Sequence, residues 1–308
     1  MQKKQTIAEA EVEKEKLNVD MYALNDRVND LYFGILLLDE QIKQNTLLQD
    51  ELERNYRQIT AYVENGIANQ ADLDAVKVEQ LNTKQKRIDL VSSRAAYLKM
   101  LSLLVGEALS PETVLEKPVP QSTVSAVSEI RRPELALFDA QGAGLQVQEK
   151  ALNVRHLPQF GLFVQGAYGN PGLDMLKNEF SPYYIAGVRL SWNFGSLYTL
   201  KNDRRVIEKK RQQLDNNRDI FLFNTRLEMT QQDQAIHSLE KQMRDDDEII
   251  RLRTNIRKAA EAKVANGTLT VTEMLRELTN ESLARQSKAM HEIQRLMGIY
   301  QLKYTIND

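Results

Sequence analysis

An uninterrupted helical pattern fills the amino-terminal part of the chain and limits the folds open to it. Between Ile7 and Val63 the sequence has no proline and a single glycine, Gly34. Apolar residues recur there at steps of four and three, the heptad spacing of helices that pack side by side. Such a helix extends for about 90 Å, and a compact globule cannot cover an apolar stripe of that length. The stripe consists of Leu17, Met21, Leu24, Val28, Leu31, Ile35, Leu38, Ile42, Leu52, Tyr56, Ile59 and Val63.

The composition supports long helices and excludes several other classes of protein. Gly (13), Pro (7) and aromatic residues (6%) are too scarce for a sandwich, a propeller or a doubly wound sheet, which need frequent turns. The 41 basic and 43 acidic residues nearly balance, so bulk charge gives no support for nucleic-acid binding. The absence of cysteine excludes disulfides and thiolate metal sites. The sequence predicts neither a transmembrane helix nor, in its first residues, a signal peptide.

A tight helical hairpin is expected in the first third of the chain. Asn65-Gly66 is a typical helix end, because glycine readily adopts the left-handed conformation, and Asn69 or Asp72 can cap the next helix. The returning helix is expected over residues 73–104. Its apolar residues in the same rhythm are Leu81, Ile88, Val91, Ala95 and Leu98.

Prolines and small polar residues over 107–128 predict a linker between two parts of the chain. We therefore expect a first helical hairpin in residues 1–118, a linker in 119–131 and a second part in 132–308. The second part is expected to contain a helix, a β-hairpin over 158–195 and a long helical hairpin over 197–305.

In the first third of the second part, the spacing of apolar residues changes from that of a helix to every second residue, which is that of a strand. Arg132-Pro133-Glu134-Leu135 begins a helix that is expected to reach about Arg155. After Leu157-Pro158, apolar residues alternate with small or polar ones, which predicts two strands joined by a loop over 169–182. The apolar positions are Phe160, Leu162, Val164 and Tyr168 in the first strand and Tyr184, Ala186, Val188, Leu190, Trp192 and Phe194 in the second.

Two further long helices, expected over 197–265 and 271–304, indicate an internal duplication. Setting Gly66 on Gly267 gives an offset of 267 − 66 = 201 residues, which aligns the sequence Val-Glu-Asn-Gly with Val-Ala-Asn-Gly. The second copy has strands before its long helix, whereas the first copy begins inside that helix. We therefore expect a matching strand pair upstream of Met1.

The second predicted strand is typical of a transmembrane β-strand. It is apolar on one face, small or polar on the other, and has aromatic residues near its ends. Every strand edge in a bilayer must be paired, so two strands cannot span a membrane alone and several subunits would have to share one barrel. The alternative is a small hairpin that packs its apolar face on a helix. Strands continued by long helices favour a conduit.

Five segments carry a resemblance to a known family in their order and spacing. These are the Gly66 turn with Asn69-Gln70-Ala71-Asp72-Leu73, Arg132-Pro133-Glu134-Leu135, His156-Leu157-Pro158, Val188-Arg189-Leu190-Ser191-Trp192-Asn193-Phe194, and Val264-Ala265-Asn266-Gly267. They are similar to segments of the TolC family of outer-membrane factors, the exit ducts of multidrug efflux pumps and type I secretion systems. The resemblance implies a mainly α fold, with antiparallel coiled-coil hairpins in two repeats and a β-hairpin in a shared barrel. It implies a homotrimer in the outer membrane, with a periplasmic helical extension and neither catalytic activity nor cofactor.

The resemblance also implies partners and site residues. The partners are a periplasmic adaptor (membrane fusion protein), an inner-membrane transporter of RND, ABC or MFS type, and outer-membrane lipid. A family member can carry two aspartates that form cation-selecting rings; here Glu273 and Arg276 occupy those positions, which predicts modest ion selectivity. The adaptor-docking tips correspond to Asn65, Gly66, Ile67, Asn266, Gly267, Thr268 and Leu269, and the membrane strand to Tyr184, Val188, Leu190, Trp192 and Phe194.

Other constellations give weaker signals. The acidic run at 245–248 suggests a solvated helix face, since consecutive helical residues diverge and cannot converge on a metal. His156, His237 and His291 have neither metal-ligand spacing nor a nucleophile motif. Two alternatives remain besides a passive channel subunit: a coiled-coil scaffold without a pore, which leaves the strands unexplained, and a periplasmic adaptor, which would carry one hairpin and a Gly-rich β domain. An enzyme is the weakest interpretation.

Overall fold

The structure is a computed structural model that describes residues 1–308 except 120–128, 156, 177, 193 and 308. Its elements, in chain order, are α1 (Gln2–Glu64), α2 (Gln70–Val105), α3 (Pro133–Arg155), β1 (Gln159–Gly169), β2 (Ser181–Ser191), α4 (Ser196–Ala265) and α5 (Val271–Ile306). The chain forms two compact units. One contains Met1–Val19 and Pro133–Phe221, and the other contains Asp20–Arg132 and Leu222–Asp308.

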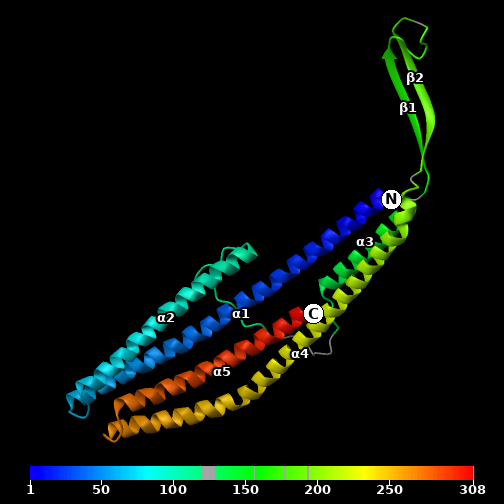
Figure 1. The fold of residues 1–308 in the computed structure, drawn as a ribbon. Coiled ribbons are helices and arrows are strands. Elements are labelled where there is room, and N and C mark those ends of the chain that lie inside the picture. Colours follow the sequence, from blue (N-terminus) through cyan, green and yellow to red (C-terminus); the bar gives the residue numbers. More distant parts are fainter. Residues whose placement is uncertain (120–128, 156, 177, 193, 308) are drawn as a thin grey trace. The chain divides into compact units, whose positions relative to one another are not determined.

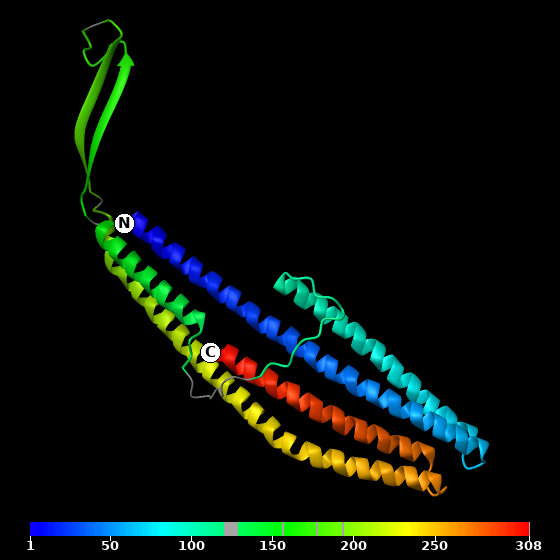
Figure 2. The same cartoon turned by 180° about the vertical axis from the view of Figure 1, so that it is seen from behind.

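The expected fold class is confirmed. α2 returns alongside α1, α5 returns alongside α4, and α3 with the β-hairpin lies between these helical pairs in the sequence (Figures 1 and 2). The division into residues 1–118 and 132–308 stays a proposal, because the compact units group the chain by contacts rather than by repeats. Most of the expected linker at 119–131 lies outside the described residues.

The stripe of α2 that packs in the hairpin differs from the stripe that the sequence favoured. Of the expected residues only Leu98 is buried. The others are exposed: Leu81, Ile88, Val91 and Ala95. The buried positions of α2 are instead Val76, Thr83, Leu90, Leu98 and Leu101. α2 is apolar on more than one side, and heptad spacing cannot show which side meets the neighbouring helix.

The described residues that follow α2 are tied to the first hairpin. Arg94 forms an ion pair with Asp39 of α1 and donates hydrogen bonds to the carbonyl oxygens of Pro111 (2.7 Å) and Thr113 (2.8 Å). Leu109 and Leu115 pack on a cluster of Leu31, Ile35, Leu98 and Leu101. The described first half of the linker expected over 107–128 contains no helix or strand, but these apolar contacts and Arg94 hold it against the first hairpin.

The hairpin of α4 and α5 has apolar ends and an ionic middle. Met229, Ile236, Leu302 and Ile306 are buried at one end, and Ala260, Val264, Met274 and Leu278 near the turn. Between these clusters, Arg295 pairs with Glu240 (3.0 Å) and His291 with the buried Asp246 (2.9 Å). Ion pairs as well as apolar contacts therefore hold the middle of α5 against α4.

Glu281 is the most deeply buried charge of this ionic section, at 1% exposure. It accepts hydrogen bonds from Thr254 (2.8 Å) and Arg257 (2.5 Å) of α4 and from Arg285 (2.5 Å) of α5. Burial raises the pKa of the Glu281 carboxyl, but the hydrogen bonds from Arg285, Arg257 and Thr254 outweigh it, so the pKa is lowered overall. The carboxylate therefore joins the two helices in its ionised form.

Candidate functional site

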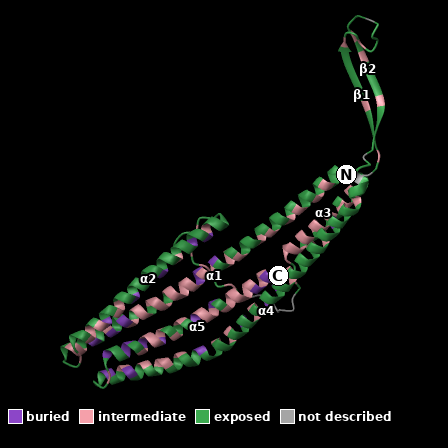
Figure 3. Cartoon of the chain, viewed as in Figure 1, coloured by how far each residue is buried: buried purple, intermediate pink, exposed green. Residues whose placement is uncertain are grey.

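The β-hairpin has one continuous apolar face. β1 and β2 are antiparallel, and alternate residue pairs point to the same side of the sheet. The pairs on the apolar side are Phe160↔Leu190, Leu162↔Val188, Val164↔Ala186 and Gly166↔Tyr184. Leu162 is 87% exposed and Tyr184 77%, and Figure 3 shows exposure along nearly the whole hairpin. The alternative of a hairpin packed on a helix is therefore wrong for the described residues, which leave this face uncovered.

The opposite face is mixed: Arg189, Gln165 and glycines lie on it, as the alternation predicts, but so do Phe163, Tyr183 and Ile185. Arg189 faces Gly161 across the sheet, Phe163 faces Gly187, and Gln165 lies one pair further along. The guanidinium of Arg189 stacks over the Phe163 ring at 5.5 Å from its centroid. Sequence reasoning placed Arg189 on the polar face without giving it a role. A single charge in an otherwise uncharged strand is the signal that could have identified it.

The sheet has only two described strands, so each strand has one edge with unpaired backbone groups. Unpaired edges recruit further strands, and in a bilayer each unpaired N–H or C=O group costs several kcal/mol. An exposed apolar face together with two open edges is the geometry of a barrel segment rather than of a finished sheet.

Two expected strand residues lie beyond the strand. β2 ends at Ser191, which pairs with Gln159, the first residue of β1. Pro158 precedes that residue and has no N–H to donate, so the ladder stops there. Trp192 and Phe194 therefore follow the last pair, with their rings 4.4 Å apart. Of the expected membrane-strand residues, Tyr184, Val188 and Leu190 lie within β2.

The first helical turn is built as expected. Gly66 has φ +73°, in the left-handed region, and the side-chain amide of Asn65 donates to the Ala61 carbonyl oxygen (2.7 Å). Asn69, rather than Asp72, is the N-cap of α2, and the two residues form a reciprocal capping box. Ile67 is exposed at the end of the turn.

The second turn repeats this geometry at the 201-residue offset. Gly267 has φ +67°, and the side-chain amide of Asn266 donates to the Ala262 carbonyl oxygen (2.9 Å). Thr268 donates its hydroxyl to the Lys263 carbonyl oxygen (3.1 Å). Leu269 packs on an apolar cluster that contains residues of both hairpins: Leu52, Ile59, Val76, Val264, Val271, Met274 and Leu278. The structure thus brings the two predicted tips together.

Replacing Gly66 with alanine is expected to lower the free energy of unfolding by about 1 kcal/mol, because a Cβ is disfavoured at positive φ. No atom lies within 4 Å of the added Cβ, so the loss would come from the backbone alone. Gly66→Asn should cost less, since asparagine tolerates this conformation. Urea unfolding followed by circular dichroism measures both, and equal losses would contradict the backbone explanation.

Glu273 caps the start of α5 at the second tip, together with Thr270. It lies in the first turn of α5, where its carboxylate accepts from the backbone N–H (3.1 Å) and the hydroxyl (2.8 Å) of Thr270. These hydrogen bonds lower the pKa of Glu273, and the charge of Arg276 adds to the effect. Arg276 itself is largely exposed. The Glu273 carboxylate is therefore partly neutralised by the helix start and a nearby cation.

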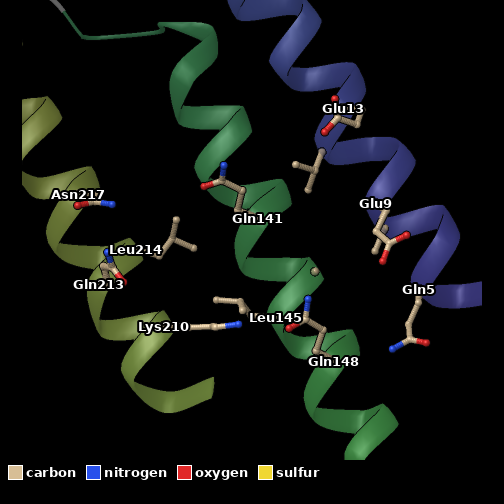
Figure 4. Close-up of a pocket in the computed structure, with 13 residues that line it drawn as sticks. Gln5, Glu9, Glu13, Gln141, Leu145, Gln148, Lys210, Gln213, Leu214 and Asn217 are labelled. Atoms are coloured by element: carbon tan, nitrogen blue, oxygen red, sulfur yellow. The ribbon is translucent and has the colours of Figure 1, made fainter. Parts of the chain in front are cut away.

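A groove of about 400 Å³ lies in the unit that contains the β-hairpin. Figure 4 shows it between α1, α3 and α4, with Gln5, Glu9 and Glu13 on one side and Lys210 on another. Its lining combines glutamine, glutamate and lysine side chains with apolar residues such as Leu145 and Leu214.

Within the described part of the chain, no three histidine, aspartate or glutamate side chains gather to hold a metal ion. No described helix has both the length and the apolar character needed to cross a bilayer.

Comparison with known proteins finds similar structures but no match by sequence. No protein-family model and no curated protein matches the chain. The structure is similar to VceC, an outer membrane protein of Vibrio cholerae (TM-score 0.80, 11% identity, 98% of this chain and 74% of VceC). It is similar to the CmeC outer membrane channel of Campylobacter jejuni (0.78, 11%, 98% and 66%) and to CusC (0.78, 16%, 99% and 73%). The chain therefore has the fold of outer-membrane channels over two thirds to three quarters of their length.

Proposed function

We propose that this chain is a subunit of an outer-membrane channel that exports small molecules or proteins passively, as part of a tripartite efflux pump or a type I secretion system. The observation that carries the proposal is the β-hairpin, whose apolar face is exposed and whose two edges are open. A shared barrel covers that face with lipid and pairs those edges. The channel fold supports the same function.

Exposed apolar side chains on the helices support assembly of several copies, and we propose a homotrimer. These side chains include the unburied stripe of α2 and apolar residues of α4 such as Ile249, Leu252 and Ile256. Contacts between copies would remove these side chains from water. We propose that the two tips then meet a periplasmic adaptor, which connects to an inner-membrane transporter.

The alternatives account for fewer of these features. A pore-free scaffold needs the helical hairpins but gives no reason for an exposed apolar strand face. A periplasmic adaptor would carry one helical hairpin, whereas this chain has two.

Reconstitution tests the proposed function directly. The protein, purified in detergent and added to a planar lipid bilayer, is expected to give stepwise conductance and to migrate as a trimer after chemical cross-linking. A membrane-bound protein that never conducts would contradict the channel, and a soluble monomer would contradict both the channel and the assembly. A variant with proline at Val164 serves as control, because it removes a ladder N–H and should abolish conductance.

Modest ion selectivity is expected from the tip charges. Glu273 is engaged by Thr270, and Arg276 adds an opposite charge nearby, so a ring of these residues should attract cations only weakly. Reversal potentials in a salt gradient measure this, and Glu273→Gln should shift them little. A strong cation preference that disappears in Glu273→Gln would contradict the expectation.

A further inference from the structure

Arg189 is the one charged residue in the two strands of the β-hairpin. The other residues of β1 (Gln159–Gly169) and β2 (Ser181–Ser191) are apolar, small or neutral polar. No described carboxylate forms an ion pair with Arg189. An unpaired cation in a membrane-spanning element is costly unless it faces water, and it commonly marks a functional site.

The sheet holds this cation in a defined place. Gly187 has no side chain, and the Phe163 ring occupies the space above it: a Cβ built at Gly187 would lie 2.9 Å from that ring. The guanidinium of Arg189 stacks over the same ring. Across the sheet stands Gly161, where no atom lies within 4 Å of an added Cβ. A glycine, an aromatic platform and an open neighbour together orient the guanidinium over the non-lipid face.

We propose that Arg189 lines the barrel lumen at its helix-proximal end and gives the pore a local attraction for anionic solutes. The inference rests on the proposed function, because it needs the apolar face to meet lipid. The two faces alternate strictly, so a lipid-facing Val188 and Leu190 put Arg189 on the water-filled side. Arg189 is two residues from the end of β2, near the junction with α4. Each copy of the chain would contribute one such cation, and rings of arginine favour anions.

The absence of native cysteine allows a direct test with single cysteines. Gly161→Cys places a thiol opposite Arg189, and Leu162→Cys places one on the adjacent, apolar face. Both variants are inserted into liposomes and treated with membrane-impermeant methanethiosulfonates of similar size, one anionic and one cationic. Gly161→Cys is expected to react and Leu162→Cys to be shielded by lipid.

The local potential is then read from the ratio of the anionic to the cationic reaction rate at Gly161→Cys. A unit charge about 6 Å away in water changes each rate about threefold in opposite directions, so Arg189→Gln should lower the ratio about tenfold. Arg189→Lys should keep most of the ratio. Lys150→Gln, which removes an exposed cation of α3, should leave it unchanged.

The reaction rates distinguish a failure of the proposed function from a failure of the inference about Arg189 alone. If Leu162→Cys reacts as fast as Gly161→Cys, the face does not meet lipid, and the proposed function fails with the inference. If Leu162→Cys is shielded but Arg189→Gln leaves the ratio unchanged, or Gly161→Cys is itself unreactive, only the inference fails. Denatured samples of every variant supply the intrinsic reaction rates, so a misfolded variant is recognised by its equal reactivity before and after denaturation.

Discussion

Arginine at Val164 is expected to prevent the β-hairpin from assembling in a bilayer, whereas arginine at Gln165 should leave assembly intact. The two residues are neighbours in the middle of β1 but point to opposite faces. An arginine on the lipid side near the membrane midplane costs about 2–4 kcal/mol per chain. On the lumen side the same side chain stays in water. The matched pair changes charge and size equally, so the difference isolates the direction of the face.

The measurement is the fraction of protein that resists extraction from membranes by alkaline carbonate, with conductance as a second readout. Val164→Arg should shift most of the protein to the soluble fraction, and Gln165→Arg should resemble the unchanged chain. If the two variants are retained in the membrane to the same extent, the two faces of the hairpin do not meet lipid and water respectively, and the barrel proposal fails.

Removing the Glu281 carboxylate should have the largest effect on stability. Glu281→Ala leaves the guanidinium of Arg257, whose side chain is 15% exposed, with fewer carboxylate partners inside the helical hairpin. Breaking a buried ion pair from one side typically costs 3–5 kcal/mol, and because Arg285 is part-exposed we expect about 2–4 kcal/mol here. Glu248→Ala removes an exposed carboxylate that pairs within α4, and should lower the stability far less, because exposed ion pairs contribute little. Denaturant unfolding of the two variants measures the difference.

The effect of Glu281 should depend on pH in a defined direction. Its folded pKa is lowered below the ordinary value of 4.5, so its contribution is complete above that value and is lost as the pH falls through the folded pKa. The gap in unfolding free energy between the unchanged chain and Glu281→Ala should therefore narrow only below about pH 4. A gap that narrows near neutral pH, or that is constant down to acid, would assign the loss to packing instead of charge.

Sequence patterns predicted the elements and their ends because these depend on neighbouring residues. The heptad steps between Ile7 and Val63 correspond to one helix, and the Asn-Gly pairs at 65 and 266 are left-handed turns in the structure. The alternation in the second strand gave the correct faces for Tyr184 to Leu190. Its extension to Phe194 was wrong, because strand length also depends on the partner strand, and the partner begins at Gln159.

The sequence by itself determined the long helices, the two turns and the two-faced strands, since helix propensity, glycine at positive φ and side-chain alternation act over a few residues. Tertiary structure alone decided which stripe of α2 is buried, how Arg94 fastens the segment after α2, and that Glu281 meets Arg257 of α4. It also placed Arg189 on the Phe163 ring. These contacts join residues from different elements, and a local pattern is the same whichever neighbour the fold supplies.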